Sequence, residues 1–101
     1  MARQSFQDLI QGETPVLVDF SASWCGPCQT QKPMLQEFAQ KMGDRVKVIE
    51  VDVDRNQAAA SRYQVRSVPT LMLFKRGKVV WNHSGVAPVH TLQKAVAPHV
   101  A

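Results

Sequence analysis

The chain has 101 residues, of which 45% are hydrophobic and 20% are charged, and its formal net charge is +4. This length is enough to bury one core, and the composition is that of a globular protein. No apolar run approaches the ~20 residues of a membrane-spanning helix, and the N-terminus lacks the pattern of a signal peptide. We therefore expect a single domain over residues 1–101, located in the cytoplasm, with no membrane partner.

Charge is distributed unevenly along the chain. Residues 1–54 hold eight acids and five bases, a net of −3, whereas residues 55–101 hold seven bases and no acid, a net of +7. The bases predict either one positive face that steers acidic partners or an ordinary solvated surface; they include Arg62, Arg66, Lys75, Arg76, Lys78 and Lys94. Few aromatic residues accompany them, so we expect no nucleic-acid partner.

The first half of the chain predicts two helices and two strands. Ser5 followed three residues later by Asp8 is a capping-box pattern, which opens a short helix that ends near Gly12. The apolar, β-branched run 15–20 is expected of a strand covered on both faces, and 46–53 of a second strand. Between them a helix is predicted from Cys25 to Met42, with Met34, Leu35, Phe38 and Met42 on its apolar side.

The second half predicts a helix over residues 56–63 and a hairpin whose two strands span 70–74 and 78–83. A final helix is predicted over 88–97. Asp54 or Asn56 is the candidate cap of the first of these helices. Arg76-Gly77 between the two apolar runs is a hairpin signature. Strands joined through a helix favour parallel pairing and the hairpin adds an antiparallel pair. The fold class is therefore α/β, a mixed central sheet with helices on both faces.

Both cysteines lie together in the stretch "SASWCGPCQT", and three interpretations are open. A disulfide across so short a loop would stabilise the fold by only about 2 kcal/mol. A structural zinc site needs four ligands, and the other candidates lack ligand-type spacing, so we expect no metal; they are His83, His90 and His99. A redox-active dithiol is the third interpretation.

The redox interpretation accounts for the position of the pair. Cys25 falls at the start of the predicted helix, where unpaired N–H groups and the positive end of the helix dipole favour a thiolate. Cys28, one turn further, is expected to be buried and to keep its proton. Two thiols in opposite environments suit disulfide exchange, in which one sulfur attacks and the other resolves.

The matched motifs point to a known family. "WCGPC" (24–28), preceded by "VDF" (18–20) and followed by "VPT" (68–70) and "SGV" (84–86), resembles thioredoxin over nearly the whole chain. The resemblance implies a central sheet of about four strands, with the first strand of the family short or absent because "MARQ" is barely long enough for it. Without that strand, the sheet edge becomes a candidate dimerisation or aggregation site.

The resemblance implies a role for each matched residue. Cys25 attacks a client disulfide to form a mixed disulfide, Cys28 displaces the reduced client, and Asp19 takes part in deprotonating Cys28. Pro69 matches a cis-proline opposite the cysteines. The motif and pKa-tuning residues are Trp24, Gly26 and Pro27, and the client-binding residues are Trp24, Val68, Pro69, Gly85 and Val86.

Asp19 also stands out on physical grounds. A carboxylate in an otherwise apolar strand is costly unless it is hydrogen-bonded or neutral, so its pKa should rise. The alternative is an aspartate satisfied by local hydrogen bonds. The family's occasional lysine partner for this aspartate is Glu50 here, and the lysine often found after the second cysteine is Gln29. If Glu50 lies near Asp19, its charge should raise the pKa further.

The leading hypothesis is a general protein-disulfide reductase, an electron carrier that contributes to redox homeostasis. The resemblance implies no bound cofactor, recycling by a thioredoxin reductase with electrons from NADPH or ferredoxin, disulfide-containing client proteins, and a monomer. One alternative within the same chemistry is a reductant dedicated to one acidic client. Another, from a different class, is an interaction module whose dithiol is idle.

Overall fold

The computed structural model describes residues 5–100, within which four strands form one mixed sheet. The strands are β1 (Val16–Ser21), β2 (Lys47–Asp52), β3 (Thr70–Lys75) and β4 (Lys78–Ser84), in the order β2-β1-β3-β4. β1 and β2 are parallel, whereas β3 is antiparallel to both of its neighbours. The predicted mixed sheet is confirmed, and every strand ends within one residue of its predicted bounds.

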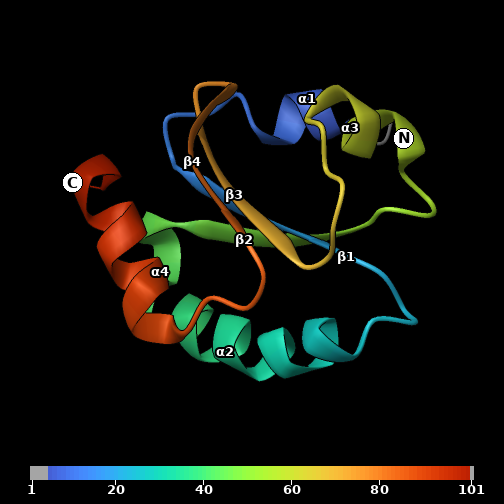
Figure 1. Cartoon of the computed structure of the whole chain (residues 1–101). Coiled ribbons are helices and arrows are strands. Elements are labelled where there is room, and N and C mark those ends of the chain that lie inside the picture. Colours follow the sequence, from blue (N-terminus) through green and yellow to red (C-terminus); the bar gives the residue numbers. More distant parts are fainter. Residues whose placement is uncertain (1–4, 101) are drawn as a thin grey trace, which may run out of the picture.

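Helices cover both faces of this sheet, as predicted. They are α1 (Phe6–Leu9), α2 (Gly26–Met42), α3 (Gln57–Arg62) and α4 (Val89–Val96), and short 3-10 turns span Gly43–Arg45 and Ala97–His99. α1 and α3 lie on one face, and α2 and α4 lie on the other (Figure 1). Asn56 occupies the cap position of α3, although its side chain makes no capping hydrogen bond.

The first helix begins where predicted and ends early. Ser5 Oγ accepts a hydrogen bond from the Asp8 N–H at 3.2 Å, and the Asp8 carboxylate accepts one from the Ser5 N–H at 3.3 Å, so the predicted capping box is present. The helix ends at Leu9 rather than near Gly12, since the chain turns there to bury Ile10 completely. The predicted end at Gly12 is therefore wrong.

The hairpin between β3 and β4 forms as its sequence predicts. Arg76 and Gly77 have φ of 52° and 80°, so both central residues are left-handed, as a type I′ turn requires. A Cβ on Gly77 would lie 2.7 Å from the side chain of Gln11. Glycine is favoured here by the backbone angle, whereas the exposed end of the Gln11 side chain could move aside.

Two hydrophobic clusters fill the layers on either side of the sheet. The cluster beneath α2 and α4 includes Leu17, Leu71 and Leu73 from the sheet, Leu35 and Phe38 from α2, and Leu92 and Val96 from α4. The cluster beneath α1 and α3 includes Val18, Phe20 and Phe74 from the sheet, with Phe6 and Tyr63 packed against it. β1 contributes alternate residues to both clusters and is buried throughout.

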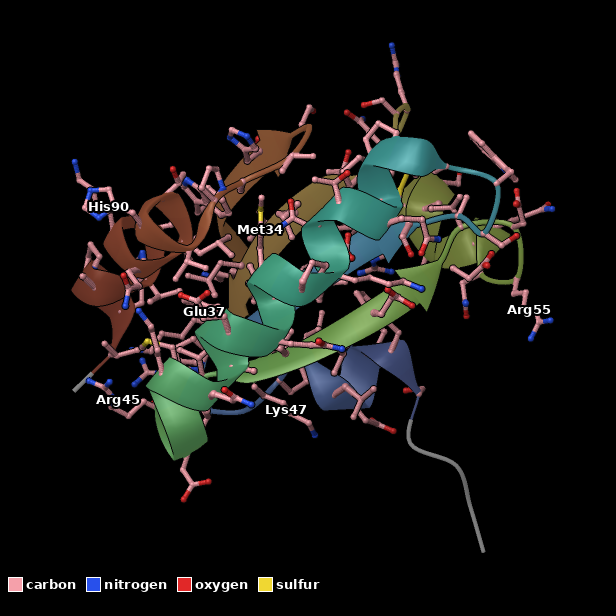
Figure 2. All side chains as sticks on the ribbon, turned by 90° about the horizontal axis from the view of Figure 1, so that it is seen from below. Met34, Glu37, Arg45, Lys47, Arg55 and His90 are labelled. Carbon is pink, nitrogen blue, oxygen red and sulfur yellow. A yellow bond between two sulfur atoms is a disulfide. The ribbon has the colours of Figure 1, made fainter. Side chains whose placement is uncertain are left out.

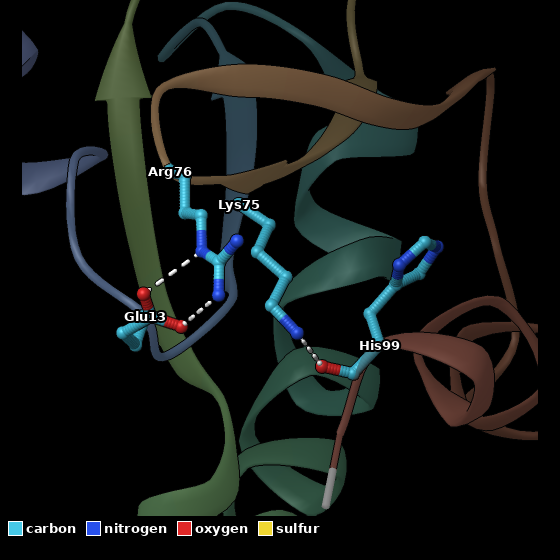
Figure 3. A network of polar contacts seen from close by, with 4 residues as sticks. All are labelled: Glu13, Lys75, Arg76 and His99. Atoms are coloured by element: carbon cyan, nitrogen blue, oxygen red, sulfur yellow. Dashed lines mark hydrogen bonds and ion pairs between the residues drawn. The ribbon is translucent and has the colours of Figure 1, made fainter.

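Basic residues of the second half do not gather on one face. Arg62 lies on α3 and Lys94 on α4, which cover opposite faces of the sheet (Figure 1). At the hairpin, Arg76 makes a two-pronged ion pair with Glu13, both N–O distances being 2.8 Å, and Lys75 donates to the His99 carbonyl at 2.9 Å (Figure 3). These contacts favour an ordinary solvated surface over a single steering face.

Two predictions concern the ends and edges of the chain. The expectation that the family's first strand is short or absent falls on residues 1–4, which lie outside the described residues. Within residues 5–100, β2 and β4 form the two edges of the sheet. In the same part of the chain, no helix is long and apolar enough to span a lipid bilayer.

Candidate functional site

The cysteine pair lies at the junction between the end of β1 and the start of α2. Cys25 is the N-cap residue of α2, and its Sγ accepts a hydrogen bond from the Cys28 N–H at 3.1 Å. An N-cap side chain usually accepts from an N–H of the first turn, and here sulfur takes the place of the customary oxygen. Pro27, in the first turn, has no N–H, so this position adds no unpaired donor. The sequence prediction of a cysteine at this helix start is confirmed.

The structure holds the two sulfurs in the oxidised state. Cys25 and Cys28 form a disulfide with Cα atoms 5.3 Å apart. Cys28 is 1% exposed, as predicted, and Cys25 is only 4% exposed. Cys25 is less accessible than the outer, attacking sulfur that the sequence suggests, because Ala22, Val53 and Val68 pack around the pair.

Asp19 lies on β1 in an apolar environment. Its side chain is fully buried, and neither carboxylate oxygen has a hydrogen-bond partner among residues 5–100. Burial first, and then the charge of Glu50, raise the pKa of Asp19 to about 7, and Lys32 opposes both. The alternative of locally satisfied hydrogen bonds is not observed. Glu50 is the direct neighbour of Asp19 across the β1–β2 ladder, as the charge argument requires.

A second chain segment, directly before β3, lies beside the disulfide. The Val68–Pro69 peptide bond is cis, as the resemblance implies. The carbonyl oxygen of Val68 lies 3.6 Å from Cys25 Sγ. The Pro69 carbonyl accepts a hydrogen bond from the Gly85 N–H at 2.8 Å, which ties the two loops together. The structure thus brings Val68, Pro69 and Gly85 to the same end of the molecule as the cysteines.

Trp24 stands at the surface beside the disulfide. Its side chain is 70% exposed, which is unusual for a tryptophan. The indole Nε1–H donates to Asp54 Oδ2 at 2.9 Å and so fixes the ring against the loop after β2. Val86, on the loop after β4, is half-buried, and Gly26 is exposed. The sequence did not indicate the Asp54 contact, because the two residues are 30 positions apart.

The contact between Gln31 and Ala87 is a second one that the sequence did not indicate. The residues of α2 that face the core are Cys28, Gln31, Leu35, Phe38 and Met42, whereas the predicted Met34 is only half-buried. Gln31 is fully buried, and its amide bonds both backbone groups of Ala87. Its spacing in the buried stripe was the available signal, but a glutamine on a helix is usually read as exposed.

The histidines do not form a metal site with the cysteines. Among residues 5–100, no group of three or more potential ligands from His, Cys, Asp and Glu is close enough to hold an ion. His83 lies on β4 with a ring nitrogen 3.3 Å from the Val86 carbonyl oxygen. His90 on α4 points away from α2, along which Met34 and Glu37 lie (Figure 2).

Known proteins resemble this chain over most of its length. The family model described as Thioredoxin matches residues 1–98. "Thioredoxin 1" of Synechococcus elongatus is 45% identical over 94 residues, which cover 93% of this chain and 88% of the relative. "Thioredoxin" of Bacillus subtilis is 47% identical over 88 residues, covering 87% and 85%. "Thioredoxin Y, chloroplastic" of rice is 44% identical, and the chain spans only 53% of that protein, about half its length.

The structural comparison agrees with the sequence comparison. The solved structure of a mutant thioredoxin from Halobacterium salinarum superposes with a TM-score of 0.87 at 36% identity, covering 99% of this chain and 87% of that one. The fold and the paired cysteines define a thiol–disulfide exchange protein. The chain belongs to the thioredoxin family.

Proposed function

We propose that this protein is a protein-disulfide reductase that works by dithiol–disulfide exchange. One observation carries the proposal: Cys25 caps α2 and its Sγ accepts the Cys28 N–H, while Cys28 is buried one turn further in. In the reduced protein the same N–H and the helix dipole favour negative charge on Cys25. Family membership supports the same activity.

The exchange proceeds in two displacements. The Cys25 thiolate attacks one sulfur of a client disulfide, a mixed disulfide forms, and the other client sulfur leaves as a thiolate. Cys28 then loses its proton and attacks Cys25 Sγ, which releases the second client thiolate. The client gains two electrons, and the protein ends as the Cys25–Cys28 disulfide that the structure contains.

Asp19 is the proton acceptor for Cys28 in this scheme. It lies on β1, on the face covered by α2, together with Leu17. A carboxyl whose pKa is raised to about 7 is half-ionised near neutrality, which suits a group that must both accept and release a proton. Transfer through a water molecule would not need direct contact between the two side chains.

Clients dock on the surface around the disulfide. Its proposed members are Trp24, Val68, Pro69, Gly85 and Val86, with Gly26 and Pro27 completing the active-site turn. The exposed indole offers a flat apolar contact, and the Val68 carbonyl lies beside the reactive sulfur, where it can accept a backbone N–H from an extended client segment.

The wider setting follows from the chemistry. We assign the whole of residues 1–101 to one thioredoxin domain that needs no bound cofactor. A thioredoxin reductase recycles the disulfide with electrons from NADPH or ferredoxin, so the protein takes part in electron transport. A reductase of disulfides works in a reducing compartment, and we propose the cytoplasm. The protein acts as a monomer on disulfide-containing clients in general.

Insulin reduction tests the proposed function. With dithiothreitol, or with NADPH and a thioredoxin reductase, the protein should accelerate the reduction of insulin disulfides above the uncatalysed rate. Cys25→Ser should abolish the acceleration, because it removes the thiolate that attacks the client disulfide. Cys28→Ser should trap the mixed disulfide. No acceleration by the wild-type protein, or full activity of Cys25→Ser, would overturn the proposal.

A further inference from the structure

Gln31 is the only strongly polar side chain among the buried residues of α2, and its surface is completely buried. Its Nε2–H donates to the Ala87 carbonyl at 2.9 Å, and its Oε1 accepts the Ala87 N–H at 2.7 Å. Both backbone groups of one loop residue are therefore held by one side chain. The two residues are 56 positions apart in the sequence.

The loop that Gln31 holds also carries proposed client contacts. It connects β4 to α4, and Gly85 and Val86 precede Ala87 directly. Among the described residues, Ala87 has no other hydrogen-bond partner for its N–H or its carbonyl. Gly85 is tied to Pro69, and Val86 lies against His83. Gln31 thus supplies hydrogen bonds that link this loop to the helix that carries the sulfurs.

An apolar side chain at the same position of α2 would leave the N–H and the carbonyl of the buried Ala87 without these partners. The amide satisfies both of these backbone groups and so fixes the position of the loop relative to α2. Gln31 lies one turn after Cys28 on α2, so its two hydrogen bonds, together with the Gly85–Pro69 hydrogen bond, hold the loop in position relative to the disulfide.

We propose that Gln31 is a positioning residue in the docking of protein clients. It holds Gly85 and Val86 in the position, relative to the Cys25–Cys28 disulfide, that client docking requires. The inference rests on the proposed reductase function. The inference predicts a selective effect. The position of the loop affects the reduction of a protein client, which covers the docking surface, and does not affect the reduction of a small disulfide that touches only Cys25.

The experiment compares Gln31→Met with wild type in single-turnover oxidation of the reduced protein. Methionine is nearly the same size and fills the stripe without bonding Ala87. Two oxidants are used over a range of concentrations: insulin as the protein client, and bis(2-hydroxyethyl) disulfide as the small one. Gln40→Met is the matched control, because Gln40 is an exposed glutamine on the same helix.

The expected result is a divergence between the two oxidants. For Gln31→Met, half-saturation with insulin moves to a concentration roughly 3- to 10-fold higher, while the limiting rate and the rate with the small disulfide stay at wild-type values. Gln40→Met behaves as wild type with both. Equal losses with both oxidants, or no loss with insulin, would overturn the inference while leaving the reductase function intact.

A second variant separates positioning from simple stability. Gln31→Glu keeps the acceptor for the Ala87 N–H and turns the Nε2 donor into an oxygen that faces the Ala87 carbonyl. The increase in the half-saturating insulin concentration caused by Gln31→Glu should become smaller at low pH, where the protonated carboxyl donates to that carbonyl again. The increase caused by Gln31→Met should not depend on pH. A pH-independent defect, or failure of both variants to fold, would show that Gln31 serves only the fold. If wild type reduces neither oxidant, the reductase function and this inference fall together.

Discussion

Asp19 and Glu50 are direct neighbours across the parallel β1–β2 ladder, so an exposed carboxylate lies beside a buried one. The buried carboxyl has no hydrogen-bond partner within residues 5–100. Both burial and the neighbouring charge disfavour its ionised form, and its pKa rises to about 7 from an ordinary value of 3.8. The fold therefore carries a carboxyl that is costly to ionise, and this cost depends on pH.

The first prediction concerns stability against pH. Because the folded-state pKa of Asp19 exceeds the unfolded value, the folded protein binds the proton more tightly between pH ~4 and ~7, so stability falls as pH rises through that window. The full effect is at most about 4 kcal/mol. Asp19→Asn should lose this slope, as measured by urea unfolding across the window. Parallel curves for wild type and variant would contradict the assignment.

Glu50→Gln should lower the pKa of Asp19. Its neutral amide removes one of the two influences that raise this pKa, while burial remains. The upper end of the stability slope should therefore move to lower pH, and NMR titration of the Asp19 carboxyl should show the same shift directly. Glu37→Gln is a matched control, since Glu37 is exposed on α2 and pairs with Lys41. An unchanged Asp19 titration in Glu50→Gln would refute the coupling.

The proton-acceptor role makes a kinetic prediction. Asp19→Asn should slow release of the client from the mixed disulfide by about 10²-fold or more, while formation of the mixed disulfide slows much less. Rapid quenching followed by mass spectrometry separates the two steps, since the mixed disulfide accumulates when its resolution is slow. An equal slowing of both steps would speak against Asp19 as the group that takes the proton from Cys28.

The Trp24–Asp54 hydrogen bond predicts a specific effect on clients. Asp54→Ala frees the indole, so kcat/KM for insulin should fall about 2- to 5-fold. Because the contact is exposed, the free energy of unfolding should change by less than about 1 kcal/mol. Asp54→Asn keeps an acceptor oxygen and should behave as wild type. Full activity of Asp54→Ala would mean that docking does not depend on the ring's fixed position.

Features that depend on local pattern could be read from the sequence. The apolar run before the cysteines specified β1, and Arg76-Gly77 specified the hairpin turn, because each pattern reports backbone preference and burial in its own segment. Cys25 at the start of α2 followed from the same kind of signal. Asp19 was recognisable because a charge within a fully apolar strand has few explanations.

Features that depend on distant contacts could not be read in this way. Gln31 looks like an exposed helix residue until the loop at Ala87 is brought against it from the other end of the chain. The hydrogen-bond partner of Trp24 is Asp54, which only the folded chain places next to it, on the loop after β2. α1 ended early because Ile10 was drawn into the core, which depends on tertiary packing rather than on helix signals.

Titration of Cys25 tests the central claim most directly. The reduced protein is alkylated with iodoacetamide across a pH series, and mass spectrometry separates Cys25 from Cys28. Asp19→Asn serves as a control that removes the buried carboxyl whose pKa is raised to about 7. We predict a midpoint for Cys25 clearly below the ~8.5 of an ordinary thiol, with Cys28 titrating well above it. A Cys25 midpoint at or above ~8.5, or the same midpoint for both sulfurs, would contradict the account.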